Sequence, residues 1–176
     1  MDKIFQNKAY KILELFMEHS LKHYHIREIA RKLNLNHATV AKYVQQLCKL
    51  KLIRKELSTL YPTYYANRED KIFRFYKKQY MLYKIRKSGL VKYIEKKSWP
   101  NCMVLYGSCG DGYYTERSDI DIFVEAKDID LDLYQFEKKL GKKIHVLFEP
   151  NINDLSRELR INIVLGTLLY GHINVM

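Results

Sequence analysis

The sequence has 176 residues, of which 47% are hydrophobic, and its formal net charge is +11. This size and composition indicate one medium or two small globular domains and exclude a disordered chain. No run approaches about 18 consecutive apolar residues, so we expect no membrane-spanning helix. The first residues do not read as a signal peptide, and the three scattered cysteines form neither a disulfide framework nor a Cys-x-x-Cys zinc motif. We therefore expect a cytoplasmic protein with reduced thiols and no membrane contact.

The charge is distributed unevenly along the chain. Residues 1–97 contain 23 Lys and Arg against 8 Asp and Glu, whereas residues 98–176 contain 8 against 12. This asymmetry indicates two modules with different partners. A basic half is also compatible with a merely solvated surface, and it points to nucleic acid only where the same residues show a DNA-binding pattern.

Three helices are predicted in the first 50 residues. Apolar residues recur at helical spacing over residues 4–18, and again over the shorter segment 25–33. Asn34-Leu35-Asn36 reads as a turn, in which Asn36 is a good N-cap. A third helix is then expected over residues 37–50. Two short helices around a tight turn are typical of a helix-turn-helix arrangement.

A β-hairpin is predicted after the third helix. Residues 52–57 and 61–67 read as its two strands, joined by a turn near Ser58-Thr59. Pro62 has no backbone N–H, so we expect the second strand to lie at a sheet edge. Three helices followed by a hairpin resemble the winged helix-turn-helix family of prokaryotic regulators over about residues 4–67. The resemblance implies binding to double-stranded DNA, commonly as a homodimer.

The third helix is the expected DNA reader. Val40, Val44, Leu47 and Leu50 are expected to face inward, and the opposite face carries small, amide and cationic side chains that suit a major groove. Cationic residues of the hairpin are expected to contact phosphates. The predicted DNA-binding residues are His37, Ala38, Thr39, Lys42, Gln45, Gln46, Lys49, Arg54 and Lys55. A trihelical module that docks onto another protein remains an alternative.

Residues 68–97 are predicted to form a helical connector, interrupted at Ser88-Gly89. Its aromatic and aliphatic side chains recur every three or four residues. Such a stripe is more typical of a core or a dimer interface than of a platform for base stacking, because the helix must bury one face.

The chemistry-bearing residues lie in the second half of the chain. The apolar run 102–106 reads as a buried strand that leads directly into Gly107-Ser108. After ten further residues, Asp119 and Asp121 occupy one face of a second strand, about 6–7 Å apart along it. Such a carboxylate pair suits Mg²⁺, which prefers oxygen ligands and substrate phosphates. Gly107 permits a close backbone approach, and Ser108 offers a hydroxyl and an N–H group to a phosphate.

This ordered set is similar to the signature of the DNA polymerase β-like nucleotidyltransferase superfamily. The ten-residue spacer resembles that of the minimal nucleotidyltransferases of prokaryotes, and the resemblance covers about residues 98–171. It implies a small mixed sheet flanked by helices, with Mg²⁺ and an NTP, expected to be ATP, as cofactor and substrate. It also implies that Asp119 and Asp121 are catalytic metal ligands and that Gly107 and Ser108 bind the nucleotide.

The remaining elements are a helix over residues 132–140, a strand over 143–149 and a final helix over about 152–169. The resemblance implies a third catalytic carboxylate on that strand, but His145 stands at the matching position. Glu149 lies about 13 Å further along the strand, too far to replace it. His145 is suited to act as a general base, since its ordinary pKa is near ~6.5, but it is a poorer Mg²⁺ ligand than a carboxylate.

We therefore predict an α+β protein with three parts: a DNA-binding domain over residues 1–67, a connector over 68–97 and a nucleotidyltransferase domain over 98–176. The first hypothesis is transfer of a nucleotide to a hydroxyl of a protein acceptor. The resemblance implies a HEPN-domain toxin as that acceptor and an antitoxin that regulates its own operon. The alternative, favoured by His145, is a catalytically degenerate nucleotide-binding transcriptional regulator. Modification of a small molecule and DNA polymerisation are less favoured, because no further substrate domain is evident.

Overall fold

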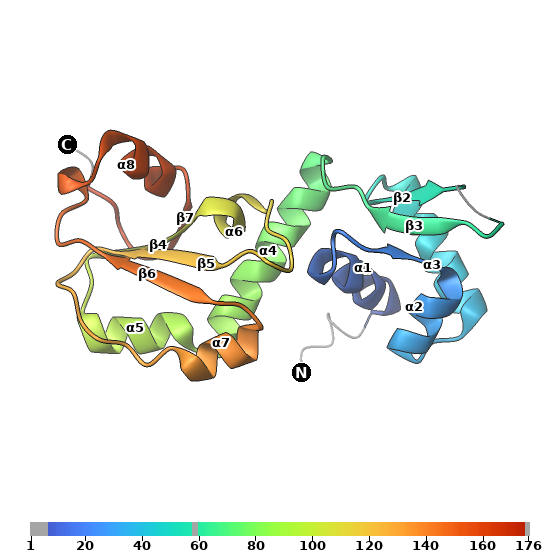
Figure 1. Ribbon diagram of the computed structural model, residues 1–176, viewed down its shortest axis with the longest axis horizontal. Helices are drawn as coiled ribbons and strands as arrows, with labels where there is room; N and C mark the ends of the chain where they lie inside the picture. The colour runs from blue at the N-terminus through green and yellow to red at the C-terminus, as the bar shows by residue number, and fades with distance from the viewer. Residues whose placement is uncertain (1–6, 58–59, 175–176) are drawn as a thin grey trace. The chain divides into compact units, whose positions relative to one another are not determined.

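The computed structural model describes residues 7–57 and 60–174 and contains helices and two small sheets, so the protein is α+β as predicted (Figure 1). The chain divides into two compact units, Met1–Lys77 and Lys78–Met176. The boundary falls inside helix α4 (Lys71–Ser88), which lies within the segment expected to be a connector. Each unit is described by itself below.

The first unit contains the three helices expected from the sequence. They are α1 (Lys8–Glu18), α2 (Ile26–Leu33) and α3 (His37–Lys49), while the predicted positions 4–6 lie outside the described residues. The side chain of Asn36 accepts a hydrogen bond of 2.8 Å from the backbone N–H of Ala38, so the predicted cap of α3 is confirmed. Asn34 ends α2 in the left-handed conformation, with a φ of 50°.

A three-stranded antiparallel sheet completes the first unit. It consists of β1 (His23–Tyr24), β2 (Ile53–Glu56) and β3 (Thr63–Ala66), in the order β1-β3-β2. The prediction that the second hairpin strand lies at an edge is wrong, because β1 pairs with its other side. Pro62 precedes the first paired residue, so its missing N–H costs no ladder hydrogen bond. The predicted turn at residues 58–59 lies outside the described residues.

The second unit is built on a mixed four-stranded sheet. Its strands are β4 (Cys102–Tyr106), β5 (Ile120–Val124), β6 (Ile144–Phe148) and β7 (Thr167–Gly171), in the order β6-β5-β4-β7. β4 is antiparallel to both β5 and β7, whereas β5 and β6 are parallel. The mixed sheet flanked by helices agrees with the predicted architecture.

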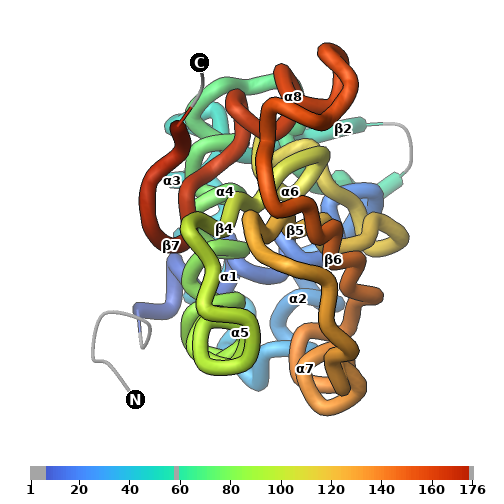
Figure 2. Tube along the Cα trace, turned by 90° about the vertical axis from the view of Figure 1, so that its left-hand side faces the viewer, coloured from blue at the N-terminus to red at the C-terminus, as the bar shows by residue number. Residues whose placement is uncertain are grey.

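Helices cover both faces of this sheet (Figures 1 and 2). Met103 and Leu105 of β4 belong to one core cluster, together with buried residues of α5 (Leu90–Ser98) and α7 (Tyr134–Leu140). Val104, which points to the opposite face, packs in a second cluster with Ile163 of α8 (Arg157–Val164). The two-residue period of the strand therefore builds two apolar layers. The segment expected to be a connector thus contributes α5 to this core.

The prediction of one final helix over residues 152–169 is wrong. The chain instead forms the 3₁₀ helix η2 (Ile152–Asp154), α8 and the edge strand β7. The reason is the close packing at Gly166, where an added Cβ would lie 2.6 Å from the carbonyl oxygen of Leu105. A glycine here lets the chain leave α8 and return as a strand that satisfies the outer backbone groups of β4. Within residues 7–57 and 60–174, no helix has the length and apolar character needed to cross a bilayer.

Candidate nucleotide-binding site

The site begins where β4 ends. Gly107 starts the short helix α6 (Gly107–Asp111) directly after Tyr106, and its φ of 63° lies in the left-handed region. A Cβ added to Gly107 would lie only 2.8 Å from Oδ2 of Asp121. The absence of a side chain at residue 107 therefore makes room for the Asp121 carboxylate. The structure thus brings together the Gly-Ser turn and the Asp-x-Asp pair, as the sequence predicted.

The two aspartates lie at the start of β5. Asp121 is paired with Tyr106 of β4, and Asp119 immediately precedes the strand. Burial raises the pKa of Asp121 above its ordinary value, His145 acts in the opposite direction, and the negative charge of Asp119 raises the pKa further. Two neighbouring carboxylates that repel each other in a partly desolvated position form a site that favours a cation.

His145 lies on the neighbouring strand at the level of these carboxylates. It is the β6 residue paired with Asp121, and its Nε2 lies 3.3 Å from Oδ2 of Asp119. The histidine side chain is 66% exposed and the aspartate side chain 44% exposed, so both are open to a ligand. Glu149 follows β6 and donates its backbone N–H to Val124, at the other end of β5. The strand alignment expected from the sequence is therefore the observed one, with a histidine in the third position.

Comparison with protein families gives a match for this part of the chain. Residues 88–172 match the family model described as "Polymerase beta, Nucleotidyltransferase". This part of the chain is therefore similar to nucleotidyltransferases. The match begins before α5, which agrees with the packing of that helix in the core of the second unit. Comparisons with curated proteins and with solved structures give no match.

The matched region offers oxygen ligands suited to Mg²⁺. This family generally uses an NTP and Mg²⁺. Asp119 and Asp121 provide two carboxylates with mutual repulsion, which a divalent cation would relieve. Among the residues that the structure describes, no three His, Cys, Asp or Glu side chains form a ready-made metal group. The donor set therefore fits a cation shared with substrate phosphates better than one enclosed by protein ligands alone.

Two further residues hold the segment that enters the Asp-x-Asp pair. Nζ of Lys142 donates hydrogen bonds of 2.6 Å to the carbonyl of Thr115 and 2.8 Å to that of Ser118. The thiol of Cys109 donates to the carbonyl of Asp119 at 3.2 Å. Burial is the main cause that lowers the pKa of Lys142. The sequence did not single out either residue, because nothing in the pair Lys142-Lys143 shows which lysine points inward.

The predicted DNA-binding residues lie on the surface of the first unit. Thr39 is half-buried, and the other eight positions are exposed on α3 and β2. Val40, Val44 and Leu47 are buried as expected, but the prediction that Leu50 faces inward is wrong, because α3 ends at Lys49 and Leu50 is 65% exposed. The arrangement leaves the polar face of α3 available to a partner. Binding of DNA by this face stays a prediction.

Replacing Gly107 with alanine should damage the site as well as the backbone. We expect Gly107→Ala to lose about 1–2 kcal/mol of stability from left-handed strain and to weaken binding of a nucleotide by about tenfold or more, because its Cβ displaces the Asp121 carboxylate. Gly141→Ala is the matched control, since Gly141 has a φ of 67° with nothing within 4 Å of an added Cβ. Calorimetric titration and thermal unfolding measure both effects, and equal nucleotide affinity in the two variants would contradict the prediction.

Lys142 should stabilise the domain far more than its neighbour. We expect Lys142→Met to lower the free energy of unfolding by about 1–3 kcal/mol, because two loop carbonyls lose their donor. Lys143 is 73% exposed in an ion pair with Glu137, so Lys143→Met should cost less than about 1 kcal/mol. Urea unfolding gives the energies, and amide hydrogen exchange shows whether residues 115–119 lose protection. If the two variants behave alike, Lys142 does not hold this loop.

Proposed function

We propose that the protein binds ATP with Mg²⁺ in its nucleotidyltransferase domain and transfers a nucleotide to a hydroxyl group of a protein acceptor. The observation that supports this most is the position of the Asp121 carboxylate against Gly107, beside Asp119 and next to His145. The match of residues 88–172 to a nucleotidyltransferase family supports the same reaction class. ATP, the protein acceptor and the metal are parts of the proposal.

In the proposed reaction, the acceptor oxygen forms a bond to the α-phosphorus while the bond to the departing pyrophosphate breaks. Mg²⁺, when bound, supplies charge neutralisation to the phosphates. Asp119 and Asp121 would hold the cation, and Ser108 would donate to a phosphate oxygen. In the tautomer whose Nε2–H donates to Asp119, Nδ1 of His145 is the nitrogen left to accept a proton, and in this proposal it would take the proton of the attacking hydroxyl.

The acceptor in this proposal is a HEPN-type toxin, and the protein is its antitoxin. The ten-residue spacer between Ser108 and Asp119 supports it, because that spacing resembles the minimal nucleotidyltransferases of prokaryotes. A second candidate is a catalytically degenerate regulator that binds a nucleotide without turning it over. His145 favours this candidate, since an imidazole is a poorer Mg²⁺ ligand than the carboxylate expected at its position.

We also propose that the first unit is a winged helix-turn-helix domain that binds double-stranded DNA, with a homodimer as the binding form. The order of three helices and an antiparallel hairpin supports the domain type. The exposed amide and cationic side chains on α3, together with the excess of Lys and Arg before residue 98, support DNA as the partner. The combined activity would be nucleotide transfer and transcriptional regulation by one chain.

Transfer can be tested with ATP carrying a label on its α-phosphate, Mg²⁺ and a HEPN-domain protein as acceptor. We expect wild type to label the acceptor and Asp119→Ala/Asp121→Ala to leave it unlabelled, because the metal site is lost. His145→Ala should lower the rate by about 10²–10⁴-fold if the imidazole is the general base. Glu149→Ala is the control and should label normally, because Glu149 lies at the other end of β5.

The outcomes of this assay separate the two candidate functions. Labelling of the acceptor by Asp119→Ala/Asp121→Ala at the wild-type rate would contradict the proposal that the protein is an enzyme. Absence of labelling by wild type, together with DNA binding that changes on addition of ATP, would support the degenerate regulator. If wild type does not label the acceptor but His145→Asp does, the missing third carboxylate is the cause of the inactivity.

DNA binding can be tested by gel shift against DNA from the protein's own promoter. We expect Gln45→Ala to weaken binding to a specific site by about 1–3 kcal/mol, since Gln45 would contact a base. Lys42→Ala should reduce the slope of log affinity against log salt concentration by about one, since Lys42 would contact a phosphate. Lys138→Ala removes an exposed charge from the other unit and should bind like wild type. Unchanged affinity in both α3 variants would favour the protein-docking alternative.

A further inference from the structure

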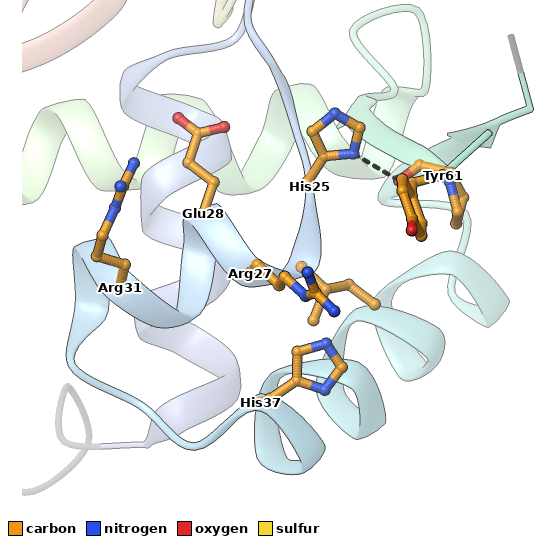
Figure 3. A pocket seen from close by; sticks show the side chains of 8 residues that line it. His25, Arg27, Glu28, Arg31, His37 and Tyr61 are labelled. Carbon is orange, nitrogen blue, oxygen red and sulfur yellow. Dashed lines mark hydrogen bonds between the residues drawn. The ribbon is translucent and has the colours of Figure 1, made fainter. Parts of the chain in front are cut away.

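The first unit contains a cavity of about 800 Å³ to which the proposed functions assign no small-molecule ligand (Figure 3). It lies between the start of α2, the start of α3 and the two residues that precede β3. A volume of this size falls within the range of about 300–1,000 Å³ that small-molecule sites occupy. The residues that matter for its chemistry are His25, Ile26, Arg27, His37, Tyr61 and Pro62.

One side of the cavity is cationic. Figure 3 shows Arg27 extending from the start of α2 toward His37 at the start of α3, whereas Arg31 and Glu28 lie further along α2. Within residues 7–57 and 60–174, neither Arg27 nor His37 has an acidic partner. A guanidinium and an imidazole placed in this way offer several N–H donors to one anionic group, and a phosphate suits them best.

The other side is aromatic and aliphatic. Ile26, Pro62 and Tyr61 line it, and Tyr61 is an exposed residue. Nδ1 of His25 lies 3.1 Å from the carbonyl oxygen of Pro62, which joins the residues before β3 to the start of α2. This hydrogen bond keeps the wall in place without a ligand, and an exposed tyrosine ring is a surface on which a planar base can stack.

We infer that this cavity binds a nucleoside monophosphate, with the base against Tyr61 and Ile26 and the phosphate on Arg27 and His37. A small molecule that carries both a planar ring and a phosphate matches both walls at once. Duplex DNA matches them less well, because it presents phosphates to the cavity while its bases remain stacked in the helix. The site is separate in residues from the nucleotide site at Gly107 and Asp121.

His37 is also one of the residues predicted to contact DNA, so an occupied cavity would compete with DNA for the start of α3. This consequence rests on the proposed DNA-binding function, whereas binding of the ligand does not. The protein would then respond to the concentration of a free mononucleotide by releasing its DNA site.

The test uses the full chain as the variant Asp119→Ala/Asp121→Ala with EDTA, so that the proposed site in the second unit is disabled. AMP and UMP are titrated by calorimetry and by NMR of the backbone amides. We expect saturable shifts at the amides of residues 25–28, 37 and 61. Adenosine or inorganic phosphate alone should bind at least about tenfold more weakly, since each contacts only one of the two walls. Arg27→Ala should weaken AMP binding by about tenfold or more.

Lys32→Ala is the matched control, because Lys32 is an exposed cation on the same helix that does not line the cavity. Its AMP affinity should equal that of the parent, and thermal unfolding of each variant confirms that the first unit is folded. No saturable shifts with either mononucleotide would overturn the inference, as would equal AMP affinity in Arg27→Ala and Lys32→Ala. Protection of these residues by DNA but not by AMP would assign the cavity to DNA and also overturn it.

Discussion

The close approach of the Asp121 carboxylate to the backbone of Gly107 is the constraint on which the candidate nucleotide site depends. The β4–β5 register sets it, since pairing of Tyr106 with Asp121 places Gly107, the next residue of the chain, beside that carboxylate. The chain can make this approach only because residue 107 has no Cβ and takes a positive φ. The turn and the carboxylates therefore occupy one place, where a phosphate and its cation would meet.

The same register reaches the third strand. Parallel pairing sets His145 beside Asp121, and its ring then lies within hydrogen-bond distance of Asp119. An imidazole here changes the balance of the site, because it can take a proton but adds no negative charge for a cation. Lys142, which lies two residues before the start of β6, donates to the carbonyls of the loop before Asp119. Its charge is used to fix the backbone that carries the metal-binding pair.

The two units offer different chemistry to their surroundings. The second unit gathers carboxylates and a histidine at one end of its sheet, whereas the first unit places an arginine and a histidine near the starts of α2 and α3. Both arrangements suit phosphate-bearing partners, one through a shared cation and the other through direct N–H donors. The proposed nucleotide transfer depends on the carboxylates of the second unit, and the proposed DNA and mononucleotide binding depend on the N–H donors of the first.

The sequence by itself determined the features that depend on neighbouring residues. Strand alternation puts Asp119 and Asp121 on one face, the Gly-Ser turn follows a buried strand, and Asn36 caps α3 through its own next residues. His145 could also be matched to the third position, because β6 is a clear apolar strand. Only the tertiary structure decided which lysine points inward, that β1 makes β3 a central strand, and that β7 replaces the end of the predicted helix. The cavity around Arg27 and Tyr61 is also a feature that only the tertiary structure decided. Each of these features joins residues far apart in the chain, and a local pattern of polar and apolar residues carries no information about such contacts.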